Sequence, residues 1–297
     1  MVAVRRLALL ALCCLACGAL PAHAQALSLA YKNGDTYKYK FDTASKQTMV
    51  AGGLNLPTDV EMTADETVTV KAVDSAGTAD LAITLADLVI KTTTGGITNT
   101  MTGIPDSTVD AKVAADGRLI SSGDNQFGSG SPFLAFTGLS GGFVSAVLPA
   151  DAVKPGDTWS KSYDQAIPEG SGGIHIVSKS TYLRDESVSG FSAAVVETKS
   201  NGTMDVAIGS SSSAGAQPSP SPLPGMATIP EQGMAIKATI TSDVTTWIDP
   251  GAHRILKSRS TETEDGTMTI DFPGLTLPGT SGPMTMSGVY TTDMNPA

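Results

Sequence analysis

Apolar and polar residues alternate along most of this chain. Tyr37, Tyr39 and Phe41 would share one face of an extended segment, and the residues between them are lysines. A period of two is typical of antiparallel strands that bury one face and expose the other. The same spacing recurs in further sets: Val68, Val70 and Ala72; Leu81, Ile83 and Leu85; Val109, Ala111 and Val113; Ile174 and Ile176; Met234, Ile236, Ala238 and Ile240; Met268, Ile270 and Phe272.

Short turn sequences separate these runs. The turn Asp-Ser-Ala-Gly at 74–77 lies between two alternating runs and predicts a hairpin. Helical periodicity is scarce, and the best candidate, 131–153, is interrupted by three glycines and Pro149. The pattern therefore predicts an all-β (mainly β) chain with few short helices.

A weak internal duplication predicts how the strands are organised. The sequence Gly-Asp-Thr-Tyr-Lys-Tyr-Lys-Phe-Asp at 34–42 aligns with Gly-Asp-Thr-Trp-Ser-Lys-Ser-Tyr-Asp at 156–164. We predict two β-meander pseudo-repeats, at about 27–123 and 151–297, that join into one large curved antiparallel sheet or half-barrel. They would form a single β-rich domain over 25–297. Chance similarity between turn sequences rich in glycine, aspartate and threonine is the alternative explanation.

Two segments depart from the alternating pattern. The first, at about 209–226, is rich in serine and proline, and we expect a disordered, solvated loop there. The second, 127–148, is apolar, joins the two pseudo-repeats and contains four of the seven phenylalanines of the chain. We expect this second segment to cover the apolar face of the sheet.

The first residues have the features of a signal peptide. Arg5 and Arg6 precede an uncharged apolar run that ends in an Ala-His-Ala triplet, which predicts a leader over 1–24. The run is short for a transmembrane helix, which needs about 20 apolar residues. We expect export to the periplasm or the extracellular space. The alternative is a lipoprotein anchored through Cys17.

Composition excludes several classes of function. Cys13, Cys14 and Cys17 all lie in the predicted leader, so disulfides, cysteine–zinc sites and cysteine nucleophiles are not expected in the mature chain. The net charge of −10 includes Arg5 and Arg6 and becomes −12 without them, which argues against nucleic acid as a partner. No second long apolar run follows, so no transmembrane helix is predicted.

Two motifs resemble a known group of proteins. They are Tyr-x-x-Gly-Asp-x-Tyr at 31–37 and Leu-Pro-x-x-x-Val-Lys-Pro-Gly-Asp-Thr-Trp at 148–159. With the leader and an Asp-Gly-Arg turn at 116–118, they resemble a family of uncharacterised exported bacterial β-rich proteins of unknown function. The resemblance covers most of the mature chain and implies a β-rich fold, but no catalytic residues. The predicted curved sheet is also similar in shape to the half-barrel carriers of lipoproteins and lipids in the bacterial envelope.

One match to a catalytic motif is present. The sequence Gly-Leu-Ser-Gly-Gly at 138–142 fits the Gly-x-Ser-x-Gly elbow that exposes a nucleophilic serine, here Ser140. No parallel β/α pattern surrounds it, and the mature chain has only His175 and His253 as candidate bases. We therefore keep a serine hydrolase only as a remote alternative and predict no catalytic residues.

The polar residues do not form a metal-binding pattern. His175 should point to the solvent side of its strand, and His253 should be a turn residue. Glu262, Glu264 and Asp265 do not fit a calcium loop, so we interpret them as a solvated hairpin tip. No metal and no cofactor are expected.

The expected function is therefore non-enzymatic. We expect an exported cell-envelope protein that binds a lipid or another apolar ligand in the concave face of its sheet. The predicted ligand-binding residues are Phe133, Phe136, Phe143 and Val147. The alternative is a structural or protein-interaction module of the cell surface with a packed core and no ligand cavity. Its partner would be an envelope protein; the oligomeric state stays open.

Overall fold

The structure is a computed structural model of the chain, and it describes residues 24–122, 146–166, 170–208, 233–271 and 283–297. The predicted all-β class is confirmed, since these residues form twelve strands and no helix. The strands are β1 (Thr36–Ala51), β2 (Leu54–Val73), β3 (Ala79–Thr94), β4 (Ile97–Met101), β5 (Ser107–Val113), β6 (Leu119–Ser122), β7 (Thr158–Ala166), β8 (Gly170–Val188), β9 (Phe191–Ile208), β10 (Gly233–Asp249), β11 (Arg254–Asp271) and β12 (Met284–Pro296).

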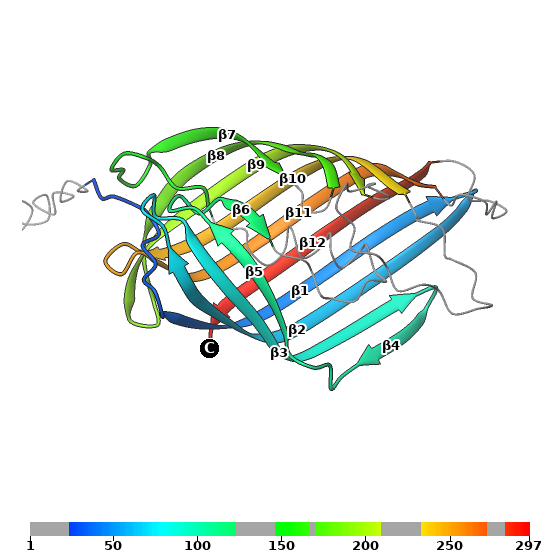
Figure 1. The fold of residues 1–297 in the computed structure, drawn as a ribbon, viewed down its shortest axis with the longest axis horizontal. Coiled ribbons are helices and arrows are strands. Elements are labelled where there is room, and N and C mark those ends of the chain that lie inside the picture. The colour runs from blue at the N-terminus through cyan, green and yellow to red at the C-terminus, as the bar shows by residue number, and fades with distance from the viewer. Residues whose placement is uncertain (1–23, 123–145, 167–169, 209–232, 272–282) are drawn as a thin grey trace, which may run out of the picture.

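All twelve strands belong to one antiparallel sheet (Figure 1). The order is β6-β5-β3-β2-β1-β12-β11-β10-β9-β8-β7, and β4 pairs with β3 beside this path. Each neighbour is also the next strand in sequence, except where β1 meets β12 and β3 meets β5. The two ends of the path, β6 and β7, come into contact, so the sheet nearly closes on itself. The predicted large curved sheet is thereby confirmed.

The alternating pattern separates an inner from an outer face. Along β12 every second residue from Met284 to Met294 is buried, and the residues between them are exposed or only partly buried. The predicted common face of Tyr37, Tyr39 and Phe41 is the inner face, where Tyr39 and Phe41 are buried.

The shared face predicted for Val68, Val70 and Ala72 is wrong at its last residue. Val68 and Val70 are buried, but Ala72 is exposed. The pairing of β2 with β3 shifts register between Val70 and Ala72. A bulge inserts one residue into the strand, so it reverses the direction of the side chains beyond it. The predicted hairpin between Val73 and Ala79 is present, and Asp74 accepts hydrogen bonds from the backbone of Ala76 and Thr78 within it.

The outer face carries ion pairs between neighbouring strands. Lys91 Nζ lies 3.0 Å from Glu61 Oε2, and Lys237 Nζ lies 2.9 Å from Asp205 Oδ2. These groups are well exposed to solvent, which screens their attraction. Such pairs therefore add solubility more than stability.

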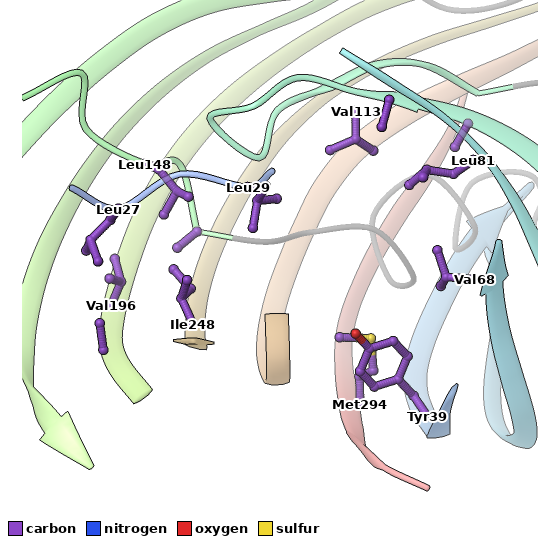
Figure 2. Packing of buried hydrophobic residues seen from close by; sticks show 14 of the residues in the cluster. Leu27, Leu29, Tyr39, Val68, Leu81, Val113, Leu148, Val196, Ile248 and Met294 are labelled. Atoms are coloured by element: carbon purple, nitrogen blue, oxygen red, sulfur yellow. The ribbon is translucent and has the colours of Figure 1, made fainter. Parts of the chain in front are cut away.

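Two chain segments outside the strands close one end of the sheet. Residues 24–33 and 146–153 meet through an isolated bridge in which the backbone amides of Gln25 and Val153 donate to each other's carbonyl oxygens at 2.8 and 2.9 Å. Figure 2 shows Leu27, Leu29 and Leu148 of these segments close to side chains of the sheet. We call the whole group the end cluster: Leu27, Leu29, Tyr39, Val68, Val70, Ala79, Leu81, Ile83, Ala111, Val113, Ala146, Leu148, Val153, Tyr182, Ala194, Val196, Ile248 and Met294.

The two Gly-Asp-Thr turns that suggested a duplication have the same local structure. The Gly34 amide donates to the Val70 carbonyl at 2.9 Å, and the Gly156 amide donates to the Tyr182 carbonyl at 2.7 Å. The backbone carbonyl of the following aspartate accepts a hydrogen bond from the Val70 amide in the first turn and from the Tyr182 amide in the second. Both glycines have positive φ, 86° and 94°. The turns are thus equivalent, and the duplication itself stays a prediction.

The predicted leader, the serine- and proline-rich segment and most of the apolar segment at 127–148 lie outside the described residues. Within the described ranges, no helix has the length and apolar character needed to cross a membrane.

Candidate binding site on the inner face

A second apolar cluster lies on the inner face, toward the opposite end of the strands from the end cluster. It is rich in methionine, whose flexible thioether adapts to ligands and packing gaps of irregular shape. We call it the methionine cluster: Ile174, Met204, Val206, Ile236, Ala238, Met268, Met284 and Met286, with Met49, Ala51, Ile176 and Ile240 partly buried against it. It combines side chains of β1, β8, β9, β10, β11 and β12.

A row of polar side chains crosses the inner face between the two clusters. Strand register places one such residue at the same level on each of seven adjacent strands. This polar row consists of Ser45 on β1, Tyr290 on β12, Glu262 on β11, Ser242 on β10, Ser200 on β9, Ser178 on β8 and Lys161 on β7. The order along β12 shows the layering, since Met284 and Met286 precede Tyr290, and Met294 of the end cluster follows it.

The interpretation of Glu262, Glu264 and Asp265 as a solvated hairpin tip is wrong. All three lie in the middle of β11, and only Asp265 is on the outer face. Glu262 and Glu264 are buried on the inner face, where Glu264 is 1% exposed. They therefore lie where polar groups are costly unless something satisfies them.

Glu264 is only half satisfied by its surroundings. The Tyr290 hydroxyl donates to Glu264 Oε2 at 3.2 Å, whereas Oε1 is buried without a hydrogen-bond partner among the described residues. Burial raises the pKa of Glu264 to about 7, with a smaller contribution from Asp265 in the same direction, although the Tyr290 hydrogen bond opposes the shift. Near neutral pH this carboxyl therefore exists in both its protonated and its charged form.

A third inward carboxyl lies at the edge of the end cluster. Glu66 on β2 is 3% exposed and is the register partner of Tyr39 on β1. Burial raises the pKa of Glu66 to about 8. Tyr39 itself donates its hydroxyl to the Ile255 carbonyl at 2.8 Å. Glu66 is thus kept largely neutral at pH 7 by its apolar surroundings.

The lysine of the polar row is already paired. Lys161 Nζ lies 2.5 Å from Asp116 Oδ2, and Arg118 Nε lies 2.8 Å from the same oxygen. Partial burial would raise the pKa of Asp116, but the hydrogen bonds from Lys161 and Arg118 outweigh it and hold the pKa below its ordinary value. The Lys161 ammonium group is therefore paired with Asp116. Lys161 lies on β7, which three strands separate from β11.

Of the predicted ligand-binding residues, only Val147 lies within the described residues. Its side chain is buried, and its carbonyl accepts hydrogen bonds from Trp159 Nε1 at 2.7 Å and Ser180 Oγ at 3.0 Å. These bonds anchor the 146–153 segment to β7 and β8. Phe133, Phe136, Phe143 and also Ser140 lie outside the described residues.

A serine, a histidine and an aspartate lie together on the outer face. His175 Nδ1 lies 2.7 Å from Asp164 Oδ1, and Ser162 Oγ lies 3.4 Å from His175 Nε2. The predicted solvent exposure of His175 is confirmed. Acyl transfer also needs an oxyanion site shielded from water. The open face of β7 and β8 does not shield these side chains, so we interpret them as a surface hydrogen-bond network.

Neither the other histidine nor the acids indicate a metal site. His253 lies in the turn between β10 and β11, as expected, where its Nδ1 is 3.3 Å from Ser28 Oγ. Within the described part of the chain, no three His, Cys, Asp or Glu side chains are grouped closely enough to hold a metal ion.

The polar row was not foreseen from sequence. Its members are serines, a tyrosine, a glutamate and a lysine, and most of the residues beside them on the outer face are also polar, so local alternation did not reveal which residues point inward. The only signal was the run Ser-Arg-Ser-Thr-Glu-Thr-Glu-Asp at 258–265, which is a poor turn sequence because it contains no glycine, proline or asparagine.

No model of a known protein family matches this chain, and none of the curated proteins matches its sequence. The resemblance to exported bacterial β-rich proteins therefore rests on the motifs at 31–37 and 148–159 together with the β-rich fold itself.

Proposed function

We propose that this chain is a non-enzymatic, exported cell-envelope protein that binds a lipid or another largely apolar ligand on the inner face of its curved sheet. The single observation that carries the proposal is the layering of that face. A polar row containing buried groups lies between the end cluster and the methionine cluster. A molecule with an apolar chain and a polar group matches this layering.

The free-energy cost of burying carboxyl groups supports a ligand-binding interior more than a purely structural one. A buried polar group without a partner costs on the order of 1–3 kcal/mol, and a charged one costs more. Glu264 Oε1 is such a group, and Glu66 is a second buried carboxyl, whereas apolar residues of similar volume would pack there at no such cost. Groups that lower stability in this way are commonly kept for binding.

The methionine cluster supports an apolar ligand of variable shape. Met204, Met268, Met284 and Met286 come from two register levels on three strands, β9, β11 and β12, and belong to one cluster on the inner face. Unbranched thioether side chains adjust to different partners with little strain. The end cluster, in contrast, is closed by residues 24–33 and 146–153 and would form the base of the binding region.

The alternative, a protein-interaction module, is favoured by a different observation. Leu54, Leu56, Ile97 and Met101 are exposed apolar residues at the ends of β1–β2 and on β4. Exposed apolar side chains that lie near one another often mark contact surfaces. Under this alternative the inner face would serve only as a packed core.

Native mass spectrometry of the mature protein, purified from a bacterial periplasm without detergent, distinguishes the two functions. We expect a bound apolar adduct that organic extraction removes and that added phospholipid or alkyl ligand replaces. A protein that carries no adduct and takes up no added lipid would contradict the ligand-binding function. In that case Leu54→Ser and Ile97→Ser would be the variants to compare in partner pull-downs.

A further inference from the structure

Glu264 is the buried group that the fold leaves least satisfied. Its neighbours in register are Ile240 on β10 and Gly288 on β12, neither of which offers a side-chain hydrogen bond. Tyr290 satisfies one carboxylate oxygen, and the other, Oε1, has no partner among the described residues. Glu264 is 1% exposed, and its Oε1 can still accept a hydrogen bond from one more donor.

The charge of the surrounding inner face favours a positive donor. Glu262 and Glu264 both point inward from β11, and Glu66 points inward from β2. The outer face of β1, β8, β9, β10 and β11 carries Lys46, Lys179, Lys199, Lys237 and Arg259, the last two of which pair with acids there. Arg254, at the start of β11, has a buried Nε but lies at the end of the sheet near Tyr39, ten residues from Glu264. The inward Lys161 is paired with Asp116. A cation that entered this region would meet carboxyl groups, among them Glu264, whose Oε1 has no hydrogen-bond partner among the described residues.

We propose that the inner-face carboxyls at Glu262 and Glu264, with the Tyr290 hydroxyl, bind an ammonium group of an amphipathic ligand whose apolar part lies on the methionine cluster. This inference rests on the proposed function. The ammonium N–H donates to Glu264 Oε1, and its charge pairs with the carboxylates in a region of low dielectric constant. A metal ion fits less well, because the described residues offer no group of three or more His, Cys, Asp or Glu side chains that could hold one.

The distances along the strands agree with one molecule spanning both regions. Met268 follows Glu264 by four residues on β11, and Met284 precedes Gly288, the register partner of Glu264, by four residues on β12. At about 3.3 Å per residue, the carboxyl level and the far end of the methionine cluster are roughly 13 Å apart. An ammonium group with an extended chain of eight carbons covers most of that distance.

Three ligands of equal chain length test the preference for a cation: octylamine, 1-octanol and octanoate, titrated by isothermal calorimetry at pH 7 against the full mature chain. We expect octylamine to bind at least tenfold more tightly than 1-octanol, and octanoate to bind most weakly. Glu264→Gln should reduce octylamine affinity to the level of 1-octanol and leave 1-octanol affinity unchanged. Asp265→Asn is the matched control, since it removes an equal charge from the adjacent outer-face position, and it should leave the preference intact.

The outcomes separate this inference from the function on which it rests. Equal binding of the three ligands to the unmodified protein, or equal loss in Glu264→Gln and Asp265→Asn, would overturn the ammonium site but leave an apolar binding protein. Absence of binding for all three, together with no lipid adduct in native mass spectrometry, would overturn both. The comparison on the unmodified protein decides the inference even where Glu264→Gln does not fold.

Discussion

The Tyr290 hydroxyl lies 3.2 Å from Glu264 Oε2, across the pair of strands β11 and β12 near the middle of the sheet. This contact joins two buried side chains with opposite effects, since the Tyr290 hydroxyl stabilises the charged form of Glu264, whereas Glu264 raises the cost of charging Tyr290. Burial raises the pKa of Tyr290, and the charge and hydrogen bond of Glu264 raise it further, so the tyrosine stays a donor at all ordinary pH values. Glu264 is the member of the pair that can change charge near pH 7.

Tyr290→Phe should raise the pKa of Glu264 above its value of about 7, because the phenylalanine removes the donor that stabilises the charged form. Carbon-13 NMR of labelled glutamate carboxyls measures the shift directly. Octylamine affinity at pH 7 should fall about two- to tenfold, the range expected for one hydrogen bond. Tyr163→Phe is the control, since Tyr163 contacts Arg118 on another part of the sheet. An unchanged Glu264 titration in Tyr290→Phe would show that the hydrogen bond has no effect in solution.

Glu66 should make the folded protein less stable as pH rises. Its pKa is about 8 in the folded chain against an ordinary 4.5, so the folded state holds the proton more tightly than the unfolded state. The associated stability is fully present below about pH 4.5 and is lost as pH rises toward 8. Between pH 5 and pH 8.5 the unmodified protein should lose this stability and Glu66→Gln should not. The difference in unfolding free energy between the two should therefore change by about a few kcal/mol in favour of Glu66→Gln.

Urea unfolding at pH 5, 7 and 8.5 measures this effect. Glu264 contributes a slope of the same sign, so Glu66→Gln should reduce the pH dependence without abolishing it. Glu61→Gln is the control, because Glu61 is exposed and paired with Lys91 on the outer face. Parallel pH profiles for the unmodified protein and Glu66→Gln would show that this carboxyl is not buried in solution.

Leu148→Ala should destabilise the protein by about 2–5 kcal/mol, the usual cost of removing a large buried aliphatic side chain. Leu148 is buried between the 24–33 segment and the sheet, where Figure 2 shows it close to Leu27 and Ile248. Chemical denaturation provides the measurement. Leu54→Ala is the comparison, since Leu54 is 67% exposed and should change stability by less than about 0.5 kcal/mol. Equal effects of the two substitutions would mean that the end cluster is not packed as described.

Gly34→Ala and Gly156→Ala should destabilise the chain by similar amounts, roughly 1–3 kcal/mol each. A Cβ atom would meet nothing within 4 Å at either glycine, so the whole cost comes from φ values of 86° and 94°. Thermal unfolding compares the variants with Gly251→Ala, in a turn without a positive φ, which should be nearly neutral. Clearly different costs at positions 34 and 156 would contradict the structural equivalence of the two turns.

Sequence alone predicted the parts of the fold that depend on local pattern. Alternation at Tyr39 and Phe41 identified the inner face of β1, and the turn at 74–77 identified the β2–β3 hairpin. The prediction from alternation was wrong at Ala72, where a bulge changes the direction of the side chains. No residue type in the sequence indicates this bulge. Turn chemistry likewise foresaw the two glycine turns but not which distant carbonyls, those of Val70 and Tyr182, they would reach.

The candidate site depends on the pairing of strands that are distant in sequence, so local sequence patterns could not predict it. Glu262 and Tyr290 are adjacent only because β11 and β12 pair in one register, and Ser45 joins them only because β1 pairs with β12. A shift by one residue in either pair would turn these side chains to the outer face. Composition suggested solvated acids, whereas the closing of the sheet placed two of them inside.

The pairing of β1 with β12 has a consequence for how the chain folds. The first strand and the last lie side by side near the centre of the sheet, so Thr43 faces Thr292 only after nearly the whole chain has been made. Contacts between residues so far apart in sequence form late, since closing such a loop costs entropy before any pairing is gained. Until β12 arrives, β1 and β11 each present an open edge. We therefore expect slow folding, on a scale of milliseconds to seconds or longer, with the C-terminal strand as the final step that makes the sheet continuous.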